Sequence, residues 1–154
     1  MRNFSKIIKT GLLFVFVASL QNQVVHAQNN SIKMTNPLLQ KSALQYQVPP
    51  FNLIKDEHFK PAFDYGLKVN IQEIGKIANN SAKATFANTV LALETSGVDL
   101  LRASTVFYNL TGSNTNPTLQ AIEAEYAPIF SAHNDKIYLN STLYKRFKAL
   151  NLDA

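Results

Sequence analysis

The chain has 154 residues, of which 46% are hydrophobic and 16% are charged, with five glycines, six prolines and no cysteine. This length favours one domain of ordinary size. The scarcity of glycine excludes collagen-like folds, and the absence of cysteine excludes disulfide-stapled folds, thiolate nucleophiles, cysteine zinc sites and iron–sulfur clusters.

The first 27 residues have the pattern of a secretory signal peptide. Three basic residues within the first nine positions precede ten apolar residues (11–20), and Val25 and Ala27 supply small residues before a cleavage site. A membrane anchor is the alternative, but a spanning helix needs about 20 apolar residues. We therefore expect cleavage after Ala27, a periplasmic or secreted mature protein, and no membrane association after cleavage.

The formal charge of +5 depends partly on this leader. Without Arg2, Lys6 and Lys9, the chain has 12 Lys and Arg against 10 Asp and Glu, which is a net charge of +2. So small an excess does not predict a basic face for nucleic acid. We expect no nucleic-acid partner.

Residues 28–55 are predicted to form an extended N-terminal arm. Asn36-Pro37 and Pro49-Pro50 disfavour helix, because proline lacks a backbone N–H and restricts the residue before it. From Asp56 onward the apolar residues follow helical spacing, so residues 56–154 are predicted to be a helical domain.

Four or five amphipathic helices are predicted in that domain. The first ends at Asn79-Asn80, the second begins with Thr85 as its N-cap and ends or kinks at Ser96-Gly97, and the third is broken at residues 112–114. No alternation of period two follows residue 55. The predicted fold class is therefore all-α, a set of antiparallel helices.

Asn116 and Asn140 are the expected N-caps of the last two helices, the first of them followed by proline at the first helical position. The side chains expected to face inward are Phe59, Phe63, Leu67, Ile71, Ile74 and Ala78, then Phe86, Val90 and Leu93, then Leu100, Ala103, Phe107 and Leu110, then Leu119, Ile122, Tyr126 and Ile129, and finally Leu143, Phe147 and Leu150.

Two histidines, His58 and His133, remain when the leader is removed. Neither stands in the pattern His-Glu-x-x-His, whose spacing of four places both imidazoles of a zinc protease on one helix face. A metal pair formed by His58 and His133 is the sharper hypothesis, and two polar or capping histidines are the favoured interpretation. Glycine-rich phosphate loops and Gly-x-Ser-x-Gly nucleophile elbows are absent from the sequence.

The other polar clusters are interpreted as structural. The stretch 133–135 (HND) is expected to be a polar capping segment between two helices. Glu94 and Arg102 are expected to pair across the break between the second and third helices, and Glu123 and Glu125 to lie on a solvated surface. The sequence thus predicts no catalytic, cofactor-binding or metal-ligating residue in this chain.

A series of short motifs nevertheless resembles a known family. The motifs are NPLL (36–39), PPF (49–51), IKDEHFKPAF (54–63), TFANT (85–89), ALETSG (92–97), FYNLTGSNTN (107–116) and HNDKIYLN (133–140). In this order they resemble the N-terminal portion of the bacterial peptidyl-dipeptidases, or dipeptidyl carboxypeptidases. These are zinc metallopeptidases similar to thimet oligopeptidase and oligopeptidase A. The resemblance covers residues 34–152.

The resemblance implies a much longer, two-lobed helical enzyme with a channel, which releases dipeptides from the C-termini of oligopeptides. It implies one zinc ion in the full-length enzyme, held by a His-Glu-x-x-His helix and a downstream glutamate that have no counterpart in this chain. It therefore implies that this chain binds no zinc and is inactive alone. Its implied partners are the missing catalytic lobe and, through the complete enzyme, oligopeptide substrates.

Two alternatives stand beside this interpretation. One is a freestanding helical module that binds a peptide or complements a missing lobe. The other is a non-functional remnant of a truncated gene.

Overall fold

The computed structural model describes residues 31, 33 and 35–150, and residues 36–150 belong to one compact unit. Every regular element of this unit in the described range is helical, which confirms the predicted all-α class. The predicted signal peptide, residues 1–27, lies outside the described residues. Within the described part, no helix has both the length and the apolar character needed to cross a membrane.

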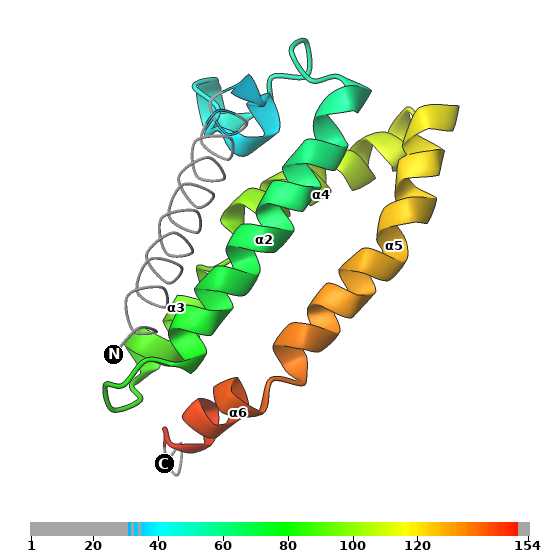
Figure 1. Cartoon of the computed structure of the whole chain (residues 1–154). Coiled ribbons are helices and arrows are strands. Elements are labelled where there is room, and N and C mark those ends of the chain that lie inside the picture. Colours follow the sequence, from blue (N-terminus) through cyan, green and yellow to red (C-terminus); the bar gives the residue numbers. More distant parts are fainter. Residues whose placement is uncertain (1–30, 32, 34, 151–154) are drawn as a thin grey trace, which may run out of the picture. The chain divides into compact units, whose positions relative to one another are not determined.

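Three long helices make up about half of the unit (Figure 1). They are α2 (Phe59–Ala78), α4 (Val98–Ser113) and α5 (Pro117–Tyr138), and the shorter α6 (Ser141–Lys148) follows them. Consecutive long helices run antiparallel, as predicted, so that α2 and α5 run in the same direction.

The predicted N-caps are confirmed by hydrogen bonds. The side chain of Thr85 accepts from the Asn88 N–H, that of Asn116 from the Leu119 N–H, and that of Asn140 from the N–H groups of Thr142 and Leu143. These oxygens satisfy backbone donors that have no partner inside the helix.

The second predicted helix is divided into two short pieces. A π-helical turn, η4 (Phe86–Leu91), leads into a single α-helical turn, α3 (Ala92–Glu94). Gly97 then adopts a left-handed conformation with φ of 71°, which confirms the break predicted at Ser96-Gly97.

Aromatic side chains form the principal core, between α2, α4 and α5. Phe59, Phe63 and Phe107 are fully buried, and the ring centroid of Phe63 lies 5.2 Å from that of Phe107 and 5.0 Å from that of Phe130. Such edge-on aromatic pairs add to the free energy gained from burial. The other buried members of this core are Leu38, Leu39, Ala62, Ala103, Val106, Leu119, Ile122 and Tyr126.

Gly66 allows α2 and α4 to pack closely. A Cβ atom at this position would lie 2.8 Å from the Cα atom of Leu100. No side chain fits into so short a separation, so the glycine is required by packing rather than by backbone conformation.

A second, smaller core joins the end of α2 to α6. Ile74, Ile77 and Leu143 are buried there, and Phe147 packs against them. Beside this core, the guanidinium of Arg146 donates hydrogen bonds to the carbonyl oxygens of Asn80 and Ala82 and to the side chains of Asn88 and Thr89.

The segment predicted as an extended arm contains two short 3₁₀ turns in its described part, η1 (Pro37–Leu39) and η2 (Gln45–Gln47). Leu38 and Leu39 are each only 1% exposed and belong to the principal core. The Asn36 side chain caps η1 and also donates to the His58 carbonyl, which lies in the 3₁₀ turn η3 (Asp56–His58) before α2.

Three of the inward-facing predictions are wrong. Phe86 is 64% exposed, because the wide π-helical turn directs Thr89 into the interior and leaves the first residue of the turn in solvent. Ile71 and Ile129 are 36% and 41% exposed, because they face a groove between α2 and α5 rather than the core.

Candidate functional site

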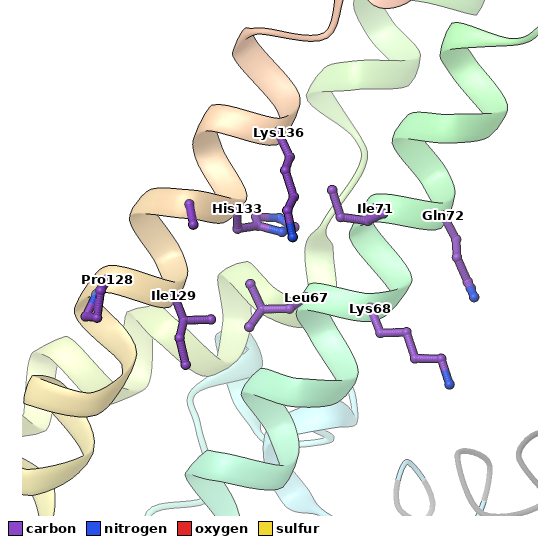
Figure 2. A pocket seen from close by; sticks show the side chains of 9 residues that line it. Leu67, Lys68, Ile71, Gln72, Pro128, Ile129, His133 and Lys136 are labelled. Carbon is purple, nitrogen blue, oxygen red and sulfur yellow. The ribbon is translucent and has the colours of Figure 1, made fainter.

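A groove with a volume of about 660 Å³ lies between α2 and α5. Figure 2 shows its two walls. Leu67, Lys68, Ile71 and Gln72 come from α2, and Pro128, Ile129, Ala132, His133 and Lys136 come from α5. Spacings of one, four and five residues place each set on one helix face.

The groove combines an apolar interior with a positive rim. Leu67, Ile71 and Ile129 supply apolar surface, and Lys68 and Lys136 are exposed beside it. No carboxylate lines this groove. An apolar anionic ligand or segment therefore suits its surface.

His133 forms the buried part of the α5 wall. Its Nε2 atom lies 2.7 Å from Oδ1 of Asn70 in α2, and the Asn70 amide nitrogen donates to the Ser96 hydroxyl at 3.4 Å. The amide nitrogen of Asn70 thus faces Ser96, so its oxygen accepts the hydrogen bond from His133. Burial lowers the pKa of His133, and the nearby Lys136 ammonium lowers it further.

The prediction that residues 133–135 form a capping segment between two helices is wrong. They lie inside α5, which continues to Tyr138, and His133 is buried against α2. The capping residue of this region is instead Asn140, which lies after the end of α5 and starts α6. A buried histidine bonded across two helices is a tertiary contact, which local sequence does not reveal.

His58 and His133 lie far apart along the helices. His58 precedes the first residue of α2, whereas His133 contacts Asn70, eleven residues beyond that first residue, about 16 Å along the axis. His58 instead has a capping role, since its Nδ1 accepts from the Lys55 N–H. The structure does not bring the two histidines together.

Arg102 pairs with Asp99 on its own helix, at 2.9 Å, rather than with Glu94 as predicted. The turn at Gly97 is held by another carboxylate that the sequence reasoning missed. Glu73 of α2 accepts a hydrogen bond from the Gly97 N–H at 2.7 Å. This contact places a negative charge at the N-terminus of α4, where it is stabilised by the helix dipole.

The two glutamates of α5 differ in exposure, since Glu123 is half-buried, unlike its predicted solvated position, and Glu125 is exposed. Glu125 forms a half-exposed ion pair with Lys60 at 2.8 Å, consistent with the predicted surface position. Nearby, the Tyr126 hydroxyl donates to Asp64 at 2.7 Å, and burial together with this hydrogen bond raises the pKa of Tyr126. These contacts join the first two turns of α2 to the middle of α5.

Sequence reasoning missed the role of Asn70, which bonds to His133 beside the groove, and the role of the two lysines at the groove's rim. Asn70 stands on the apolar side of α2 as an isolated polar residue, which was the available signal for a buried hydrogen bond. Lys68 and Lys136 looked like ordinary surface charges, and only the packing of α5 beside α2 places them around one groove.

Comparison with known proteins identifies relatives over most of the chain. It is 45% identical over 116 residues to a dipeptidyl carboxypeptidase of Salmonella typhimurium (strain LT2), a match that covers 75% of this chain and 17% of that protein. It is 39% identical over 115 residues to a dipeptidyl carboxypeptidase of Escherichia coli (strain K12), with the same coverage of both chains. No family model matches the chain.

These matches confirm the resemblance drawn from the short motifs. They also show that the chain spans only 17% of the length of each of these relatives. The relationship is therefore one of a segment to a part of a longer peptidase.

Proposed function

This chain is a relative of the dipeptidyl carboxypeptidases, and we propose that it is the N-terminal helical segment of an enzyme that releases dipeptides from the C-termini of oligopeptides. The observation that carries the proposal is the 45% identity over 116 residues to a protein named for that activity. Because 17% of the relative is matched, the activity belongs to the longer protein of which such a segment is part.

The segment contributes structure rather than chemistry to this enzyme. Its two cores hold α2, α4, α5 and α6 as one unit, and such a preformed unit can act as a wall without ordering cost when a substrate binds. We assign its exposed polar helix positions outside the α2–α5 groove to the channel through which oligopeptides reach the catalytic lobe.

Zinc is the cofactor that this proposal gives to the complete enzyme. Within residues 36–150, the structure gathers no group of three or more His, Asp or Glu side chains that could hold a metal ion. The residues in hand do not fit a zinc site. We therefore place the metal and the chemistry that depends on it in the part of the enzyme outside this segment.

Export through the predicted signal peptide is part of the proposal. Expression of residues 1–154 in a Gram-negative host, followed by fractionation and N-terminal sequencing, tests it. We expect a periplasmic product that begins at Gln28. A cytoplasmic product that retains Met1 would contradict this location.

The experiment for the function itself is a segment exchange. The matched segment of the Escherichia coli dipeptidyl carboxypeptidase is replaced with residues 36–150 of this chain, and release of the C-terminal dipeptide from an oligopeptide is measured by mass spectrometry. We expect the chimera to release dipeptides, whereas the same enzyme without the segment does not. A folded chimera without activity counts against the proposal.

A further inference from the structure

The shape of the groove between α2 and α5 suits the binding of a third helix. The apolar side chains in its walls repeat with the helical period, and Ile71 and Ile129 keep 36% and 41% of their surface exposed. The stripe on α5 runs from Pro128 to Lys136, about 12 Å along the axis, which corresponds to about two turns of a helix laid beside it.

The chemistry of the groove also favours a protein segment over a small molecule. Small-molecule sites are concave and have several polar groups that converge on the ligand. Here the polar groups lie at the edges, and the one buried polar side chain, His133, directs Nε2 to Asn70 of the opposite helix. An amphipathic helix that lays its apolar face into such a groove is a common mode of recognition.

The charges of the groove define the occupant further. Lys68 and Lys136 lie at the rim, neither takes part in an ion pair with another described residue, and no Asp or Glu lines the groove. The Lys136 charge acts on the groove itself, since it contributes to the lowered pKa of His133. A complementary helix carries carboxylates on both sides of its apolar stripe.

We propose that the α2–α5 groove is the docking site for an acidic amphipathic helix, supplied by the part of the full-length peptidase that lies outside this chain. The helix covers Leu67, Ile71 and Ile129 and pairs its carboxylates with Lys68 and Lys136. This inference rests on the proposed function, because the relatives contain more than four fifths of their length outside the matched segment.

Cysteine labelling tests the docking directly, because the chain has no cysteine of its own. Ile129→Cys places a thiol in the groove, and Ser81→Cys places one in an exposed loop as the matched control. Maleimide labelling of each position is followed by peptide mass spectrometry in the isolated 154-residue chain and in the chimera with the Escherichia coli enzyme. Labelling of each protein after denaturation gives the unprotected rate.

We expect the groove cysteine to react at least tenfold more slowly in the chimera than in the isolated chain. Equal rates in a folded chimera would overturn the proposal. Should the chimera fail to fold, the Salmonella typhimurium enzyme is the second host. Labelling is read independently of catalysis, so an active chimera with an unprotected groove refutes the docking alone, whereas a folded, inactive chimera with a protected groove refutes the function alone.

A separate variant tests whether the docked helix is acidic. Lys68→Glu with Lys136→Glu reverses both rim charges. We expect the thermal midpoint of the chimera to fall by more than that of the isolated chain, where both lysines are exposed and only Lys136, in the last turn of α5, interacts with the helix dipole. An unchanged midpoint in the chimera would overturn the charge pairing.

Labelling of the isolated chain distinguishes two other possible occupants of the groove, a peptide and a second copy of this chain. Protection of the groove cysteine by an apolar tripeptide with a free carboxylate, and not by its C-terminal amide, would overturn the proposal in favour of a peptide site. Protection that rises with protein concentration, together with a dimer in light scattering, would overturn it in favour of a second copy of this chain.

Discussion

The imidazole Nε2 of His133 lies 2.7 Å from Oδ1 of Asn70, and this buried contact ties two helices that run in the same direction. Asn70 in turn donates to Ser96, beside the Gly97 turn that Glu73 also holds. A series of polar contacts, which forms one hydrogen-bonded chain of side chains, therefore connects α5, α2 and the start of α4. Such a chain fixes the register of the helices, because each buried group depends on its partner.

The burial of His133 makes stability depend on pH. Burial lowers the pKa of His133 in the folded state, so the unfolded chain binds the proton more strongly. Above the ordinary histidine pKa of about 6.5, His133 is neutral in both states and its contribution to the free energy of unfolding is complete. As the pH falls below that value, the free energy of unfolding decreases by at most about 1.4 kcal/mol per pH unit. Urea unfolding between pH 5 and 8 measures this slope. We expect a flatter profile for His133→Gln, and identical profiles would contradict the account.

The close approach at Gly66 gives a second prediction. Gly66→Ala introduces a Cβ atom 2.8 Å from the Leu100 backbone and should lower the free energy of unfolding by about 1–3 kcal/mol. Gly75→Ala is the matched control on the same helix, since nothing lies within 4 Å of its Cβ position. It should raise stability by about 0.5–1 kcal/mol through helix propensity. Equal effects of the two substitutions in thermal unfolding would refute the packing described for Gly66.

Arg146 is expected to stabilise the loop before η4. Arg146→Ala removes the donor from the carbonyl oxygens of Asn80 and Ala82 and from the Asn88 side chain. The loss should be about 1.5–3 kcal/mol, because part-buried hydrogen bonds to a charged group are lost. Lys145→Ala, at the exposed neighbouring position, should change stability by less than about 0.5 kcal/mol. Chemical unfolding of both variants checks the difference, and a loss of similar size in each would argue against this role.

Helical spacing predicted an inward position for both Phe63 and Phe86, but their substitution should affect stability differently. Phe63→Ala empties the centre of the principal core and should cost about 3–5 kcal/mol. Phe86→Ala removes a ring that is 64% exposed and should cost less than about 1 kcal/mol. Circular dichroism melts of the two variants test this, and a large loss at Phe86 would mean that its ring is covered in the isolated chain.

Local signals in the sequence predicted much of this fold. Caps at Thr85, Asn116 and Asn140 and the break at Gly97 depend on backbone groups within a few residues, so that the sequence alone predicts them. Helical spacing likewise predicted the burial of Phe59 and the other core aromatic residues.

The groove could not be predicted in the same way. Periodicity places Ile71 and Ile129 on the apolar face of a helix, but only the packing of α5 beside α2 decides that they line an open groove. The hydrogen bond between His133 and Asn70 joins residues 63 positions apart, and no local pattern encodes such a distance. The same holds for the ion pair of Lys60 with Glu125.

The most direct test of the central claim compares peptidase activity in the isolated chain and in the Escherichia coli chimera, each with zinc and then with a chelator. We expect the chimera to release C-terminal dipeptides, to lose this activity with the chelator, and to regain it with zinc, while the isolated chain releases none under any condition. Dipeptide release by the isolated chain, or a folded chimera that never cleaves, would contradict it.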